Sequence, residues 1–170
     1  SYEARSWWQV FGDQLGGESN VGLVGTSLNC WASLSETHLQ SMFLMFSYDR
    51  LADVVEPRKL LSSKQDHTEA VYQGEIPFSR AFLEMGYALK TQLMAFRAID
   101  GVVTPAAARN EDGGVLYGIC RRLLESNKHA GDLQYPGEYG STDIHPLEVV
   151  FAKTGRGVAA GTLAAYDAWL

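Results

Sequence analysis

The sequence predicts a mainly α fold: a single-domain bundle of five or six helices over residues 1–170, with two long loops. Three observations predict this class. Apolar side chains recur at intervals of three and four residues along several segments, which is the period of an α-helix. The stretches 58–77 and 127–142 are polar and interrupted by Gly and Pro, as loops usually are. A length of 170 residues with 46% hydrophobic and 20% charged residues suits one globular domain, whole or as a piece of a longer chain.

Two helices are expected in the first third of the chain. The first ends at Gly16-Gly17 and is predicted from an apolar face formed by Trp7, Trp8, Phe11 and Leu15. Residues 20–31 show no clear period and fit either a short strand or an irregular buried segment. Residues 33–36, Ser-Leu-Ser-Glu, have the spacing of a capping box, so they predict the start of a central helix that Pro57 ends.

The longest predicted helix covers residues 78–99. Its apolar stripe consists of Phe78, Phe82, Met85, Leu89, Leu93 and Phe96. Thr104 before Pro105 predicts a short capped helical turn, and residues 116–124 predict an amphipathic helix. A last helix is expected over residues 146–155, followed by an Ala-rich terminal segment.

Charge and cysteine usage set broad limits on function. The net charge of −6 argues against a protein whose main task is to grip nucleic acid, although a local phosphate contact stays open. Cys30 and Cys120 have apolar neighbours, so buried free thiols are expected, with a disulfide or a reactive thiol as alternatives. Residues 1–5 lack the features of a secretory signal, which favours an intracellular setting, and the apolar runs are too short for a membrane span.

Catalytic candidates in the sequence are few. The four histidines are scattered without metal-ligand spacing, so no metal or other cofactor is predicted. The adjacent pair Asp66-His67 could orient a general base, but a capped turn or a solvated polar loop is the favoured interpretation. His38 is a second candidate base, with Cys30 or Tyr72 as further polar groups for a pocket.

Interface candidates lie near the chain ends. Trp7 and Trp8 suit either a wide core face or, for one of them, a partner contact. The terminal segment offers a small-residue pair and apolar side chains at Gly157, Gly161, Tyr166, Trp169 and Leu170. Arg121 and Arg122 lie opposite an apolar helix face, where they are solvated or meet a phosphate or acidic partner.

The run from Phe96 to Ala107, Phe-Arg-Ala-Ile-Asp-Gly-Val-Val-Thr-Pro-Ala-Ala, resembles an F-D-G-V-x-x-P-A-A run in coat proteins of flexible filamentous plant viruses. Those proteins are mainly helical, so the resemblance implies a helical fold and a coat-like structural subunit. It covers these twelve residues and no more of the chain.

The leading functional hypothesis is therefore a noncatalytic helical module for self-association or assembly into a larger complex. One alternative is a small enzyme or ligand-binding protein with a pocket between helices and His/Asp acid–base groups. Another is an acidic regulatory or inhibitory protein that binds an oppositely charged partner.

Overall fold

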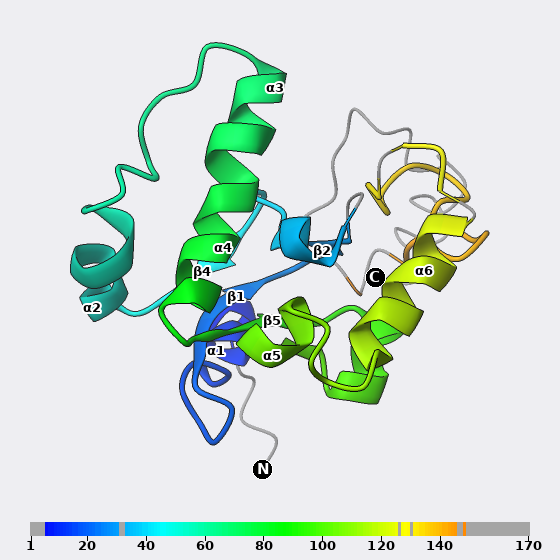
Figure 1. The fold of residues 1–170 in the computed structure, drawn as a ribbon, viewed down its shortest axis with the longest axis horizontal. Coiled ribbons are helices and arrows are strands. Elements are labelled where there is room, and N and C mark those ends of the chain that lie inside the picture. Colours follow the sequence, from blue (N-terminus) through cyan, green and yellow to red (C-terminus); the bar gives the residue numbers. More distant parts are fainter. Residues whose placement is uncertain (1–5, 31–32, 126, 130, 146–147, 149–170) are drawn as a thin grey trace.

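A four-stranded mixed sheet lies at the centre of the fold (Figure 1). The computed structural model describes residues 6–30, 33–125, 127–129, 131–145 and 148. The strand order is β4-β1-β5-β6, and a separate two-stranded sheet pairs β2 (Leu28–Asn29) with β3 (His38–Leu39). The predictions of a helical bundle and of a mainly α chain are wrong, because helices and strands are mixed through the described residues.

The two central strands, β1 (Val21–Gly25) and β5 (Ala88–Thr91), run parallel. The edge strands β4 (Leu44–Met45) and β6 (Val102–Val103) pair with them antiparallel. Every residue of β1 is buried, as expected for a strand covered on both faces. The stretch without a clear period is thus a buried strand over 21–25.

Two cores flank this sheet. Val24 belongs to the smaller core, which includes Phe11 from α1 (Trp7–Gly12). Leu23, the neighbour of Val24 in the strand, belongs to the larger core, which holds residues of the longer helices α4 (Ile76–Glu84) and α6 (Val115–Glu125). Successive strand residues point to opposite faces, so β1 contributes to both cores.

A continuous helical rod, green in Figure 1, contributes Phe78 and Phe82 to the larger core. It comprises α3 (His67–Ala70), the π-helical segment η3 (Val71–Glu75) and α4 (Ile76–Glu84). Pro77 lacks a backbone N–H and clashes with a regular preceding turn. The wider π turn directly before it keeps the chain helical. The predicted loop 58–77 is therefore helical from residue 67 onward.

The predicted helix 78–99 is wrong beyond Glu84. Gly86 has φ +86°, a left-handed conformation that ends the helix. The chain then enters β5 and the 3-10 segment η4 (Met94–Ile99). The apolar stripe continues through this break because a strand and a 3-10 turn also need buried side chains.

The predicted central helix over 33–56 is also wrong. The Ser33 hydroxyl lies 2.9 Å from the Ser35 hydroxyl, and only a 3-10 turn, η1 (Leu34–Glu36), follows. The chain next forms β3 and β4, which pair with β2 and β1. Helix resumes with α2 (Tyr48–Arg50) and the π-helical segment η2 (Leu51–Val55). Strand pairing within the tertiary fold overrides the local helical preference here.

Several predicted elements are confirmed. Helices are present as α1, which ends at Gly12 rather than at the predicted Gly16-Gly17, as α5 (Pro105–Ala108) and as α6 (Val115–Glu125). The Thr104 hydroxyl accepts a 3.1 Å hydrogen bond from the Ala107 N–H, as the predicted cap requires. The described residues of 127–142 form a loop without helix. The expected helix over 146–155, apart from Glu148, and the Ala-rich terminal segment after it lie outside the described residues. None of the helices in the described part of the chain combines the length and apolarity of a bilayer crossing.

Candidate functional site

A pocket of about 470 Å³ lies beside the π-helical turn of the rod. Ser41 and Glu75 supply its polar wall, and Glu75 is the last residue of η3. The remaining described lining residues are Met42, Phe43, Leu44, Phe46, Leu60, Leu61, Ala70, Gly74 and Phe78. We call this the Glu75 pocket. A mostly apolar lining with a few polar groups is typical of small-molecule sites, and π turns are frequent at functional sites.

A buried histidine, His38, lies next to the polar wall of the pocket. His38 belongs to β3 and is 1% exposed. Its Nδ1 lies 2.7 Å from the carbonyl oxygen of Glu36. Since a carbonyl oxygen only accepts, Nδ1 carries a proton and donates it to this bond. The other ring nitrogen, Nε2, is directed toward Glu75.

Glu75 joins this histidine to the pocket. Its Oε2 lies 3.7 Å from His38 Nε2, and its side chain is 15% exposed. Its Oε1 accepts a 2.9 Å hydrogen bond from the Ser41 N–H and another from the Ser41 hydroxyl. The carboxylate therefore presents one oxygen to Ser41 and the other to the imidazole. With a second proton, on Nε2, the imidazole would be cationic and its contact with the Glu75 carboxylate would be attractive.

Three buried hydrogen bonds that involve side chains hold the segment 38–41 against its neighbours. Ser79 follows Glu75 by one helical turn, and its hydroxyl accepts a 2.9 Å hydrogen bond from the Leu39 N–H. The Ser27 hydroxyl donates to Gln40 Oε1 at 2.5 Å. The amide nitrogen of Gln40 lies 3.3 Å from Asp132 Oδ1, which links the segment to the loop 127–142. These bonds fix His38 and Ser41 relative to the rod.

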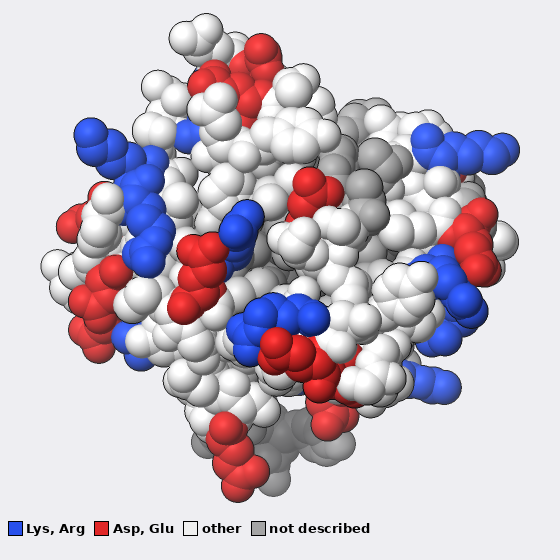
Figure 2. Space-filling model, in the orientation of Figure 1, with Lys and Arg blue, Asp and Glu red and all other residues white. Residues whose placement is uncertain are grey.

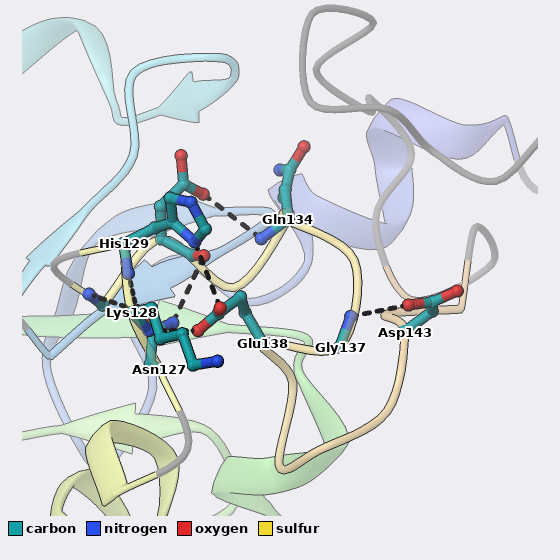
Figure 3. A network of polar contacts seen from close by, with 9 residues as sticks. Asn127, Lys128, His129, Gln134, Gly137, Glu138 and Asp143 are labelled. Atoms are coloured by element: carbon teal, nitrogen blue, oxygen red, sulfur yellow. Dashed lines mark hydrogen bonds and ion pairs between the residues drawn. The ribbon is translucent and has the colours of Figure 1, made fainter.

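The loop 127–142 forms a polar network of its own (Figure 3). Glu138 is buried and accepts hydrogen bonds from the Lys128 N–H at 2.6 Å and from His129 Nδ1 at 3.1 Å. The His129 ring stacks on Tyr135 with centroids 3.8 Å apart. Gly137 donates its N–H to Asp143 at 2.7 Å. The network ties the loop to itself.

The structure places the catalytic residues predicted from the sequence in different parts of the molecule. His38 is placed at the Glu75 pocket. His67 is exposed at the start of α3, and Asp66 caps that helix by accepting the Glu69 N–H at 2.8 Å. Tyr72 is half exposed on η3. The pairing of Asp66 with His67 is therefore a helix start, as the simpler interpretation of that dipeptide predicts.

The expectation of free thiols is wrong, because Cys30 and Cys120 form a disulfide. It joins the residue after β2 to α6, and both half-cystines are buried as predicted. A disulfide sulfur is not a thiolate nucleophile, so Cys30 is removed from the catalytic candidates in this state.

The interface candidates are described in part. Trp7 is 48% exposed and Trp8 is 51% exposed, so neither is the core residue that a wide buried face would require. Trp7 packs edge-on against Phe43 with centroids 5.5 Å apart. The remaining candidates, Gly157, Gly161, Tyr166, Trp169 and Leu170, lie outside the described residues.

The two predicted arginines, Arg121 and Arg122, have different surroundings on α6. Arg121 lies 3.5 Å from Glu125, while Arg122 lines a second pocket of about 530 Å³ with Ala95 and Ser141. On the face shown in Figure 2, acidic and basic side chains lie next to one another rather than in patches of one sign. This face therefore presents no extended field for a phosphate backbone.

Glu75 and Ser41 were not among the sequence-predicted site residues. Glu75 falls in the predicted loop 58–77, and Ser41 falls in the predicted central helix. The two residues are 34 positions apart. Their only local signal is the Gly-Glu-Ile-Pro run at 74–77, where a proline follows a carboxylate. Within the described part of the chain, no cluster of three or more His, Cys, Asp or Glu side chains could hold a metal ion. Comparison with protein-family models, curated proteins and solved structures finds no match for this chain, so the resemblance of residues 96–107 to filamentous virus coat proteins has no support beyond those residues.

Proposed function

We propose that this protein binds a small, mostly apolar molecule in the Glu75 pocket. The observation that carries the proposal is the apolar pocket itself, with the Ser41–Glu75–His38 cluster at one wall. Its volume of about 470 Å³ falls in the range of about 300–1,000 Å³ that ligand sites occupy. The ligand buries its apolar body against the aromatic and aliphatic lining, and the cluster orients its polar end.

The residues have distinct roles in this proposal. Glu75 contacts the polar end of the ligand. Ser41 holds the carboxylate through Oε1, and His38 positions it from the buried side. Phe43, Phe46 and Phe78 belong to the apolar wall.

A homologous series of neutral alcohols tests the proposal by calorimetry. Each methylene buried contributes about 0.8 kcal/mol, so octan-1-ol should bind at least about tenfold more tightly than butan-1-ol. Ala70→Phe places a ring in the pocket and should weaken octan-1-ol binding at least tenfold. Gln73→Phe adds the same ring at an exposed position of η3 and should leave binding unchanged.

Absence of octan-1-ol binding by the wild-type protein would refute the proposal. So would equal binding by wild type and Ala70→Phe, because the alcohol would then occupy another place.

A second candidate function is self-association through α1, and the half-exposed pair Trp7 and Trp8 favours it. Trp8→Ser should then lower the weight-average mass measured by light scattering at high protein concentration. Tyr48→Ser, which changes an aromatic residue that is 83% exposed elsewhere, serves as the control. A wild-type monomer across the concentration range would exclude this candidate.

A further inference from the structure

The disulfide lies at the boundary between the larger core and a third pocket. Cys30 and Cys120 both belong to the larger core, where they are 2% and 3% exposed. Both also line a pocket of about 360 Å³, which falls in the range of about 300–1,000 Å³ that ligand sites occupy. We call this the disulfide pocket. Its other described lining residues are Ser33, Leu34, Tyr117, Arg121, Leu124 and Glu125. No described residue lines both this pocket and the Glu75 pocket, so the site is distinct from that of the proposed function.

A cation lies in the wall of the disulfide pocket. Arg121 is the one basic side chain among the described lining residues, and its Nε lies 3.5 Å from Glu125 in an exposed ion pair. Thiolates rather than thiols attack disulfides, and a nearby cation stabilises a thiolate. Arg121 therefore favours ionised sulfur at this site. The small exposed area of the two half-cystines limits attack in the folded protein to a reagent that can enter the pocket.

We propose that Cys30–Cys120 is a site of thiol–disulfide exchange in the folded protein, and that its co-reactant is a low-molecular-weight thiol bound in the disulfide pocket. The attacking thiolate forms a disulfide bond with one cysteine as the Cys30–Cys120 bond breaks, and the other cysteine leaves as a thiolate that takes up a proton. A second thiolate of the co-reactant then attacks the sulfur of the co-reactant in this mixed disulfide. This step releases the remaining cysteine, which is protonated in turn, and leaves the co-reactant as its own disulfide. Two electrons thus pass from the co-reactant to the protein.

Reduction of the wild-type protein by dithiothreitol, followed in low concentrations of urea, tests whether the attack occurs in the folded state. We expect a rate that is proportional to the dithiothreitol concentration and is unchanged by urea below the unfolding transition. A disulfide that reacts only after unfolding would instead be reduced at a rate that rises with urea as steeply as the free energy of unfolding falls. That result would overturn the proposal.

Two variants test whether the disulfide pocket is the route of attack. Ser33→Phe places a ring in the pocket wall and should slow reduction at least about tenfold, because access limits the exchange. Ser35→Phe is the matched control, because Ser35 is exposed in η1 and is not among the described lining residues. Both variants lose the contact between the two hydroxyl groups, so only the position of the ring differs.

Reduction of Ser35→Phe should stay within about twofold of the wild-type rate. Equal rates in Ser33→Phe and the wild type would overturn the assignment of the pocket as the site of attack. The urea test on the wild type needs no variant, so it decides the proposal if Ser33→Phe does not fold.

Discussion

Gly101 shows how a single residue allows two segments to approach. Its φ is +70°, and a Cβ built there would lie 2.1 Å from the Thr91 carbonyl oxygen. The Thr91 N–H in turn donates to the Gly101 carbonyl at 2.9 Å. The twelve-residue run with the coat-protein resemblance contains this glycine together with the Thr104 cap. Local backbone requirements therefore account for much of that run.

Gly101→Ala should lower the free energy of unfolding by about 2–4 kcal/mol, from left-handed strain and from displacement of Thr91. Urea denaturation measures this loss. The dependence of the unfolding free energy on urea concentration should be the same in the variant and the wild type. Gly86→Ala separates the two causes, since Gly86 has φ +86° but open space around a Cβ. The loss of unfolding free energy in Gly86→Ala should be about 1 kcal/mol. Equal losses in the two variants would mean that the contact with Thr91 imposes no constraint.

The residue scale also sets the limit of sequence-based site prediction. His38 could be named because histidine is a rare and chemically distinctive side chain. Glu75 and Ser41 could not, because surface glutamates and serines are common and only the fold brings these two together. The contact that defines the pocket wall joins residues 34 positions apart.

At the scale of elements, Tyr139 attaches the loop 127–142 to η4. Its hydroxyl donates to Glu148 Oε2 at 2.7 Å and accepts from the Ala95 N–H at 2.8 Å. Burial, and secondly the hydrogen bond to Glu148, raise the pKa of Tyr139 well above its usual value. The docked loop therefore requires a neutral phenol.

Alkaline pH should loosen this attachment. Above about pH 10 a tyrosine in the unfolded chain ionises while Tyr139 in the folded protein stays protonated, so stability falls as pH rises. Tyr139→Phe should flatten the fall in unfolding free energy between about pH 9 and about pH 11. At neutral pH it should cost about 1 kcal/mol for the lost hydrogen bonds.

Tyr48→Phe, at an exposed position, should keep the wild-type pH dependence. The urea midpoints of the wild type and of both variants are measured across the pH range. A fall that is as steep in Tyr139→Phe as in wild type would show that this phenol does not control the alkaline transition.

At the scale of the whole molecule, the disulfide between Cys30 and Cys120 links two parts of the chain that are far apart in sequence. It spans 90 residues and joins the side of the fold that contains β2 and β3 to α6. Disulfides persist mainly in oxidising compartments. The pairing therefore favours such a setting.

Reduction should destabilise the whole fold by about 4–5 kcal/mol, the value that the chain-entropy model gives for a loop of this length. Urea midpoints with and without a reductant measure the effect. The chain has two cysteines, so the double variant Cys30→Ala/Cys120→Ala should have the lower midpoint and no response to reductant. Titration of two free thiols in the untreated protein would contradict the pairing.

The sequence by itself determined the elements whose signals are local. The capped turn at Thr104, the amphipathic α6 and the loop 127–142 follow from capping chemistry, helical period and Gly/Pro content. Each of these signals lies within a few neighbouring residues.

Only the tertiary structure decided the fold class, the disulfide and the pocket. The stripe from Phe78 to Phe96 keeps a helical period, yet β5 lies within it because pairing with β1 buries Ala88 and Leu89. The same is true of Ser41 and Glu75, which meet only when β3 packs on the rod. Strand pairing and side-chain convergence depend on partners distant in the chain, and a local pattern carries no information about those partners.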